Sequence, residues 1–252
     1  MSNAAWRKII DTFNILEHNF NKEPFLITAS DIWRTTGEFK TSTSREPRLL
    51  CRHETRDKRP DIFIEHNLFI MPIENGTYAI IKGDGYIDIP PILSSPLIYN
   101  SKLSFELLST SYGNSEMQHL DYAFAVGLIQ HFVGDNSLFL TIRGRKRTND
   151  FSFYVGNQKL SQKGVQSEVD AGYEGKDKSV VIEAKNSKTS NVMARQLYYP
   201  YRLWKDVTKK EVVTLFFEKR GNEYCFWKYE LEDEHQFNGF ELTSSQKYII
   251  HN

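Results

Sequence analysis

The stretch from Gln166 to Lys185 constrains this chain most, because its pattern predicts a β-hairpin with charged side chains at one end. Its first arm alternates polar and apolar residues, so Gln166, Glu168 and Asp170 share one face of a strand. Its second arm is an apolar run that ends in Glu183 and Lys185, which share a face by the same period of two. A turn rich in glycine and charge joins the arms. We therefore expect the carboxylates of Asp170 and Glu183 to meet Lys185 at one end of the hairpin.

This grouping of side chains suits a hard divalent cation. Mg²⁺ takes carboxylate oxygens, keeps several waters and sits between protein carboxylates and a phosphate. A lysine beside the metal can orient or deprotonate the attacking water and offset the charge that builds on the phosphate. Asp170 is followed after twelve residues by Glu183-Ala184-Lys185, which resembles the motif of the PD-(D/E)XK nuclease superfamily. Val169 stands where that motif has its proline, a residue that many members lack.

The resemblance implies that Asp170 and Glu183 bind Mg²⁺, for which Mn²⁺ can substitute, and that Lys185 positions the water. It also implies an in-line attack on DNA that leaves 5′-phosphate and 3′-hydroxyl ends. A second interpretation exists, because a (D/E)-x-K triplet arises easily in a chain with 32 acidic and 32 basic residues, and strands often end in solvated charges. The apolar strand before the triplet and the acid on the opposite arm favour a metal site.

Two further acids are candidate metal ligands, and each has an alternative role. Glu116 lies in the first turn of a predicted helix, where many superfamily members have an additional ligand. It could equally complement the helix dipole. Glu168 shares the face of Asp170 and could extend the metal or water network, as could Gln166, or be a solvated strand residue.

The segments around the hairpin predict one α/β unit. Ser115-Glu116-Met117-Gln118 opens a helix that is expected to reach about Phe132. Strands are expected at 138–142 and 151–155, then the hairpin, a helix at 191–204 and strands at 211–218 and 223–231. This order matches the αβββαβ core that the resemblance implies, over residues 115–231. Some members carry a glutamine and, four residues later, a tyrosine on the second helix; here Gln196 is present, but Pro200 takes the place of the tyrosine.

The N-terminal part predicts a different architecture. Short helices precede a hairpin with the turn Asn75-Gly76, which is the order of a winged-helix module. Basic residues recur at three- and four-residue steps and would line one face of a continuous helix that contacts DNA; they are Arg45, Arg48, Arg52, Arg56 and Arg59. A charge-rich helix is also commonly a solvated face. A second set of candidate DNA contacts, Arg143, Arg145 and Arg147, lies in a predicted turn near the hairpin.

Composition sets the broad class of the protein. The chain has 252 residues, of which 40% are hydrophobic, and this is enough for one large or two small domains. A proline-rich segment at 89–96 predicts a boundary between domains 1–95 and 96–252. A net charge of zero argues against a blanket DNA binder, and Cys51 and Cys225 show no spacing typical of a zinc site. No long apolar run or signal peptide is evident, so we expect a cytoplasmic protein without a membrane partner.

Together these patterns predict a mixed α/β (α+β) protein with a restriction-endonuclease-like core and an N-terminal winged-helix-like domain. The absence of a phosphate-binding P-loop argues against a motor-linked nuclease. We expect a Mg²⁺-dependent type II restriction endonuclease that binds double-stranded DNA as a homodimer. The alternatives are a repair or junction-resolving nuclease of the same fold, or a winged-helix regulator without enzymatic activity.

Overall fold

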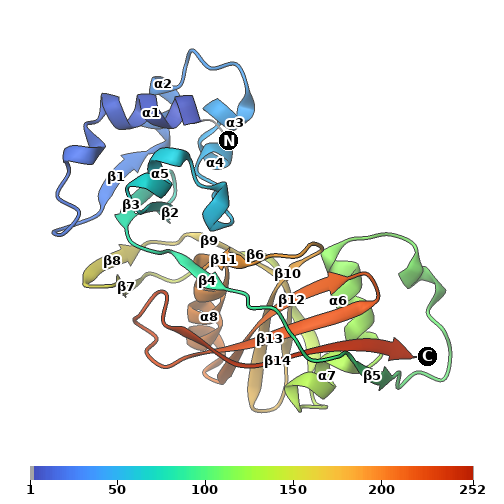
Figure 1. The fold of residues 1–252 in the computed structure, drawn as a ribbon. Helices are drawn as coiled ribbons and strands as arrows, with labels where there is room; N and C mark the ends of the chain where they lie inside the picture. Colours follow the sequence, from blue (N-terminus) through green and yellow to red (C-terminus); the bar gives the residue numbers. More distant parts are fainter. Residues whose placement is uncertain (1–2, 252) are drawn as a thin grey trace.

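The protein consists of two regions, which Figure 1 shows one above the other. The computed structural model describes residues 3–251. Residues 3–82, here called the N-terminal region, contain short helices and a small sheet. Residues 83–251, the sheet region, are built on a mixed seven-stranded sheet with helices. The predicted mixed α/β class is therefore confirmed.

Short helices make up most of the N-terminal region. They are α1 (Asn3–Thr12), η1 (Ile15–Glu17), α2 (Ala29–Thr35), α3 (Ser42–Arg45), α4 (Pro47–Leu50), η2 (Arg56–Lys58) and α5 (Asp61–Glu65). Three strands form a sheet of order β1-β3-β2, with β1 (Phe25–Thr28), β2 (Leu68–Glu74) and β3 (Thr77–Lys82). The predicted hairpin of β2 and β3 is confirmed, with Gly76 at a φ of 78° in its turn, a conformation that glycine adopts readily. The sequence pattern did not predict β1.

Two helix predictions in this region are wrong in extent. Apolar residues at helical spacing between residues 5 and 20 predict one amphipathic helix, but α1 ends at Thr12, since Asn14 adopts a left-handed conformation with a φ of 50°. The basic segment at 45–59 is not one helix but comprises the end of α3, α4 and η2. Glu46 is extended, with φ −71° and ψ 114°, because the ring of Pro47 disfavours a helical conformation in the residue before it. The arginines of this segment therefore do not line a single helix face.

Seven strands form the main sheet. They are β5 (Leu97–Asn100), β6 (Phe139–Arg147), β9 (Gln166–Glu174), β10 (Lys178–Lys185), β12 (Glu211–Arg220), β13 (Glu223–Leu231) and β14 (Phe240–His251), in the spatial order β5-β14-β13-β12-β10-β9-β6. β10 is parallel to β12 and β14 is parallel to β5, whereas the other neighbours are antiparallel. The aromatic-rich tail at 237–250 suggests either a strand that completes the sheet or a dimer contact; most of it forms β14, which lies inside the sheet between β13 and β5.

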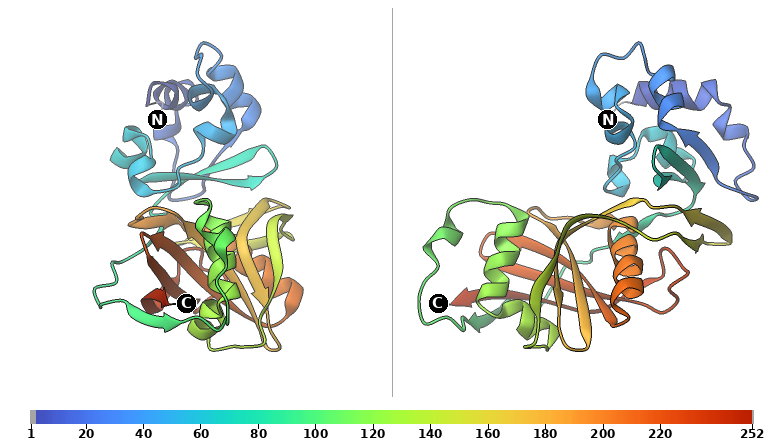
Figure 2. Two further views of the ribbon diagram at one scale, coloured as in Figure 1. Left: turned by 90° about the vertical axis from the view of Figure 1, so that its right-hand side faces the viewer. Right: turned by 180° about the vertical axis from the view of Figure 1, so that it is seen from behind.

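Helices cover the sheet on opposite faces (Figure 2). They are α6 (Glu116–Ala125) and α7 (Leu128–Val133), preceded by η3 (Leu108–Ser111), and α8 (Arg195–Thr208). Successive residues of β10 point to opposite faces of the sheet, so their packing partners identify the face that each helix covers. Val180 and Ile182 pack with Leu120 of α6, whereas Val181 packs with Trp204 of α8. Glu183 and Lys185, which follow Val181 at steps of two, therefore face α8.

Three predictions in the sheet region need correction. The helix expected to reach Phe132 is interrupted at Gly127, which has a φ of 88° and separates α6 from α7. The basic run at 143–147 is not a turn but the second half of β6, and Arg145 pairs with Glu168 of β9 in register. The strand expected to return along β6 is instead β7 (Phe151–Val155), which pairs with β8 (Gln158–Gln162) in a separate sheet.

The helix α8 begins later than the sequence predicts. Residues 191–193 form β11 (Asn191–Met193), which pairs with β4 (Tyr86–Asp88). The helix starts at Arg195 and continues through Pro200 to Thr208. As a result, Val192 belongs to a strand rather than to the apolar face of the helix.

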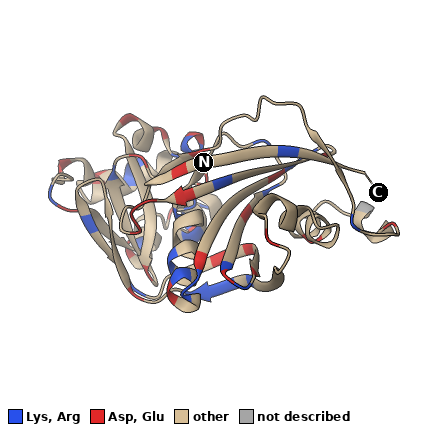
Figure 3. Ribbon diagram, turned by 90° about the horizontal axis from the view of Figure 1, so that it is seen from below, with Lys and Arg blue, Asp and Glu red and all other residues tan. Residues whose placement is uncertain are grey.

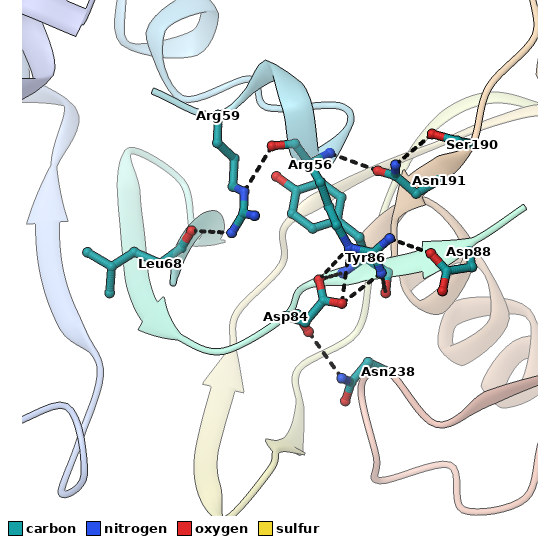
Figure 4. Close-up of polar contacts among 9 residues, drawn as sticks. All are labelled: Arg56, Arg59, Leu68, Asp84, Tyr86, Asp88, Ser190, Asn191 and Asn238. Atoms are coloured by element: carbon teal, nitrogen blue, oxygen red, sulfur yellow. Dashed lines mark hydrogen bonds and ion pairs between the residues drawn. The ribbon is translucent and has the colours of Figure 1, made fainter. Parts of the chain in front are cut away.

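Polar contacts join the two regions at β4 and β11 (Figure 4). The Arg56 backbone N–H donates to Asn191 Oδ1 at 2.7 Å, and the Arg56 guanidinium binds Asp84 at 2.7–3.1 Å and also pairs with Asp88. A second contact lies at β8, where the Lys163 N–H donates to the Ile73 carbonyl at 2.8 Å. These contacts hold the N-terminal region against the sheet region near the start of α8.

Candidate active site

The hairpin of β9 and β10 brings the three predicted residues together. The ladder between these strands runs from the Ser179–Glu174 pair to the Ile182–Ala171 pair, one residue short of Glu183 and Asp170. Beyond it, the Asp170 carboxylate oxygen Oδ2 accepts a hydrogen bond of 2.8 Å from the Ala184 backbone N–H. The acid of one arm is thereby fixed to the backbone of the triplet on the other arm.

Glu183 is the most enclosed member of the group, with 8% of its surface exposed. Its Oε1 accepts hydrogen bonds from the Lys185 ammonium and from the side-chain amide of Gln196 in the first turn of α8. The Lys185 ammonium also donates to the Ala184 carbonyl at 3.0 Å. Glu183, Lys185 and Gln196 therefore form one hydrogen-bonded cluster between β10 and α8.

The electrostatics of the cluster show an excess of negative charge. Burial raises the pKa of Glu183 to about 7, and the charges of Asp170 and Glu116 add to this effect while Lys185 opposes it. Burial likewise raises the pKa of Asp170, although the Ala184 N–H and Lys185 act in the other direction. Burial works against the Lys185 ammonium, but the surrounding carboxylates outweigh it and raise the pKa of Lys185. A cation bound here would relieve the repulsion among the carboxylates.

Glu116 belongs to this cluster, whereas Glu168 lies at its edge. Burial raises the pKa of Glu116, while the charge of Lys185 and the Asn186 backbone N–H, which binds the carboxylate, lower it. The charge of Asp170 also acts on Glu116. Glu168 is exposed and pairs with Arg145 at 3.2 Å. Its charge contributes to the raised pKa of Asp170, but its carboxylate is already engaged.

The carboxylate oxygens of this cluster suit Mg²⁺ or Mn²⁺ better than they suit a metal ion that takes all its ligands from the protein. Within residues 3–251, no three side chains of His, Cys, Asp or Glu are grouped closely enough to hold a metal ion by themselves. Mg²⁺ does not need such a cage, since it commonly uses one or two carboxylates and takes waters and substrate phosphates as its other ligands. Asp170 Oδ1 and Glu183 Oε2 make no hydrogen bond to any described residue, so each is available as a hard oxygen ligand.

A cavity of about 550 Å³ lies over this cluster, between the two regions. The sheet region contributes Asp170, Glu183, Lys185 and Glu116 to its wall. The N-terminal region contributes side chains from α4, from the loop that follows it and from β3, among them Arg48, Arg52 and Tyr78. The candidate site therefore opens into a space that neither region forms alone.

The predicted DNA-binding arginines divide into two sets. Four line the cavity: Arg48, Arg52, Arg145 and Arg147. The other four have partners elsewhere: Arg45 stacks over Trp33, Arg56 pairs with Asp84 and Asp88, Arg59 donates to the carbonyls of Arg56 and Leu68, and Arg143 pairs with Asp121. Figure 3 shows acidic and basic residues interspersed along the chain, so the charge of the cavity depends on local pairing.

Among the cavity residues that sequence reasoning missed, two carry groups able to donate hydrogen bonds to a ligand. Arg195, at the start of α8, and Tyr78, in β3, both line the cavity. Tyr78 carries no signal in the sequence, because it reads as an ordinary residue of a buried strand. Arg195 had one available signal, since it directly precedes Gln196 at the start of the helix that follows the (D/E)-x-K triplet.

Comparison with known proteins places the chain among families without an assigned function. Residues 3–80 match the family described as Domain of unknown function (DUF6996). No curated protein and no solved structure matches the chain significantly. No helix in the described part of the chain is long and apolar enough to cross a membrane. Residues 81–249, more than half of the chain, match a second family, and the protein therefore belongs to the family described as Domain of unknown function (DUF6997).

Proposed function

We propose that this protein is a Mg²⁺-dependent DNA endonuclease of the PD-(D/E)XK type, acting as a type II restriction enzyme. The observation that carries the proposal is the convergence of Asp170, Glu183 and Lys185 at the end of the β9–β10 hairpin, facing a cavity lined with arginines. Two carboxylates and a lysine in this arrangement are the groups that metal-assisted phosphodiester hydrolysis requires.

The order of elements around the site supports the proposal. α6, β6, β9, β10, α8 and β12 follow one another as helix, three strands, helix and strand, which is the αβββαβ order of the superfamily. α7 is inserted between α6 and β6, β7 and β8 after β6, and β11 before α8. The proposed catalytic residues lie on β9 and β10, the two strands expected to carry them.

Each residue of the site has a specific task in the proposed reaction. Asp170 would hold Mg²⁺ through Oδ1, and Glu183 would hold it through Oε2. Glu116 lies close enough for its charge to raise the pKa of Glu183. When bound, the metal supplies charge stabilisation at the scissile phosphate and lowers the pKa of a bound water. Lys185 orients the attacking water, and Gln196 holds the Glu183 carboxylate in position through Oε1. The cavity limits access of bulk solvent, which strengthens these interactions.

The N-terminal region would hold DNA against the site. Its helices followed by the β2–β3 hairpin support a winged-helix-like module. The basic segment is broken into turns of four residues or fewer, so it would contact phosphates through Arg48 and Arg52 rather than present a long helix to the major groove.

We propose a homodimer on the target, because one such site cuts one strand and a palindromic duplex presents two equivalent bonds. Light scattering of the protein with a short cognate duplex tests this; one 29.4 kDa chain per duplex that cuts both strands would refute it.

The two alternative functions differ in whether they require the residues at the hairpin end. A repair or junction-resolving nuclease would use the same residues on branched DNA. A regulator without enzymatic activity has no need for two acids and a lysine to converge, so the arrangement at the hairpin end favours an enzyme.

One experiment separates these functions. Purified protein is incubated with plasmid DNA, phage DNA and a four-way junction, with Mg²⁺ or with EDTA. Discrete Mg²⁺-dependent fragments from phage DNA indicate restriction, and cleavage of the junction alone indicates a resolving enzyme. The absence of any cleavage by the wild-type protein on all three substrates, with retained DNA binding, would support the regulator.

A further inference from the structure

The cavity wall carries as many acidic as basic side chains, so its binding properties depend on which charges are already paired. Arg52 pairs with Glu54, Arg145 with Glu168, and Lys185 with Glu183. Arg195 differs from these three bases. No carboxylate of residues 3–251 lies within 4.0 Å of its guanidinium, and it makes no hydrogen bond to any of those residues.

Arg195 is a half-buried cation without a counter-ion among the described residues. Its Nε is buried and has no hydrogen-bond partner in the described chain. Its guanidinium lies 5.8 Å from the centre of the Tyr199 ring. Burial lowers the pKa of Arg195, and Glu183, the one acid whose charge favours the guanidinium here, is too distant for an ion pair. A charge that loses part of its hydration without gaining a partner destabilises a protein, so the unpaired, partly buried guanidinium in a cavity wall needs a reason.

The opposite wall supplies two more unpaired donors. Arg48 of α4 is exposed to the cavity and forms no ion pair within the described part of the chain. The side chain of Tyr78 lines the same cavity, and no described residue hydrogen-bonds to its hydroxyl. Both arginines act electrostatically on Tyr78, which places the three side chains in one neighbourhood. Two guanidinium groups and a hydroxyl from both regions therefore line the cavity that also holds the carboxylates.

We infer that Arg195, Arg48 and Tyr78 form a binding site for a phosphate group next to the Asp170–Glu183 carboxylates. A guanidinium group can donate two parallel hydrogen bonds to phosphate oxygens, and a tyrosine hydroxyl can donate one more. The identification of this group as a DNA backbone phosphate rests on the proposed nuclease function. In that case Arg195 holds the strand so that the scissile bond lies at the carboxylates.

Anion binding can be measured without any cleavage. Wild-type protein and the variant Arg195→Met are titrated with inorganic phosphate and pyrophosphate in EDTA, by calorimetry and by thermal melting. We expect the variant to bind at least about tenfold more weakly, since charge-assisted hydrogen bonds are lost. We also expect its melting temperature without ligand to be equal or higher, because an unpaired, partly desolvated charge is removed. An arginine with a purely structural role would give the opposite shift in melting temperature.

Matched variants complete the test. Arg7→Met removes an exposed arginine outside the cavity and should leave anion affinity unchanged. Tyr78→Phe should weaken binding by less than Arg195→Met. Unchanged phosphate and pyrophosphate affinity in Arg195→Met, with a lower melting temperature, would overturn the inference.

A duplex DNA arm separates this inference from the proposed function. If wild-type protein cleaves duplex and Arg195→Met binds and cleaves equally well, the phosphate site is refuted while the nuclease stands. A second outcome is that wild-type protein neither binds nor cleaves DNA, while Arg195→Met binds pyrophosphate more weakly than wild type. In that case the phosphate site stands for a free phosphorylated ligand, and the proposed nuclease function is refuted.

Discussion

The ends of β10 and β12 have the same local sequence pattern but different surroundings. Each strand ends in a glutamate, one further residue and a base: Glu183-Ala184-Lys185 in β10 and Glu218-Lys219-Arg220 in β12. The strands are parallel neighbours, and Lys185 pairs with Glu218 in register. Both glutamates are buried, and burial raises the pKa of each.

The two glutamates differ in what compensates their charge. Glu218 pairs with Arg220 and accepts a hydrogen bond of 2.7 Å from the Thr189 N–H. Glu183 pairs with Lys185 but also shares its surroundings with Asp170 and Glu116, and it faces the cavity. The β12 end is thus balanced within the fold, whereas the β10 end has negative charge in excess. A (D/E)-x-K triplet becomes a candidate metal site only when other elements bring further carboxylates to it.

The sharpest test exchanges the two glutamates for glutamine, one at a time. We expect Glu183→Gln to reduce Mg²⁺-dependent cleavage by about 10²-fold or more, because a metal ligand is lost. Glu218→Gln should leave cleavage nearly unchanged but lower the free energy of unfolding by about 1–3 kcal/mol, since Arg220 loses its buried partner. Cleavage rates and urea denaturation of both variants check this. Equal loss of activity in both would abolish the distinction between the two strand ends.

The bases of the two triplets should differ in the same way. Lys185→Met is expected to bind DNA but cleave it about 10²-fold more slowly, because the attacking water is no longer oriented. Arg220→Met should cleave at a rate close to that of the wild type. Single-turnover cleavage at saturating protein, alongside a binding isotherm in Ca²⁺, separates the chemical step from affinity. A Lys185→Met variant with full cleavage would remove Lys185 from the site.

DNA affinity should depend on the cations of the cavity beside the end of β10, and not on the arginine at the end of β12. Neutralising Arg48 or Arg147 should weaken binding on both specific and non-specific duplex. Each loss should reduce the log–log salt slope by about 0.9, the value for one neutralised phosphate. Arg220→Met serves as the control and should leave the slope unchanged. Fluorescence anisotropy over a salt series measures both quantities, and an unchanged slope in Arg48→Met would identify Arg48 as a solvated surface residue.

The last prediction concerns the pH dependence of stability. The pKa of Glu183 is about 7 in the folded protein and 4.5 as a reference for the unfolded chain. Between these values the folded state binds the additional proton, so this carboxyl makes the protein less stable as pH rises from 4.5 to 7. In EDTA, Glu183→Gln should therefore gain stability over the wild type with rising pH, by on the order of 3 kcal/mol at most. Denaturation at pH 5 and 7.5 tests this, and a difference that shrinks as pH rises would contradict it.

Local patterns in the sequence predicted the elements that depend on neighbouring residues. The β9–β10 hairpin, the β2–β3 hairpin and strands β12 and β13 are where periodicity and turn residues indicate them. Some predicted helices failed for local reasons, at Asn14, Pro47 and Gly127, whereas other failures depended on distant partners. Gly144 suggested a turn in the basic run at 143–147, but β9 pairs with this segment as a strand, and Gly144, with a φ of 70°, lies at an irregularity in the ladder. The domain boundary expected near residue 95 stays a prediction; the second family match begins at residue 81.

The sequence by itself determined the catalytic candidates Asp170, Glu183 and Lys185, because a side-chain period of two and a short turn place them at one hairpin end. Only the tertiary structure decided that Glu116 joins them, that Arg56 joins the two regions instead of lining the cavity, and that Arg195 and Arg48 line the same cavity. The physical reason is that hairpin geometry acts over a few residues. Charge compensation instead depends on which side chains the packing of α6, α8 and the N-terminal region brings within reach.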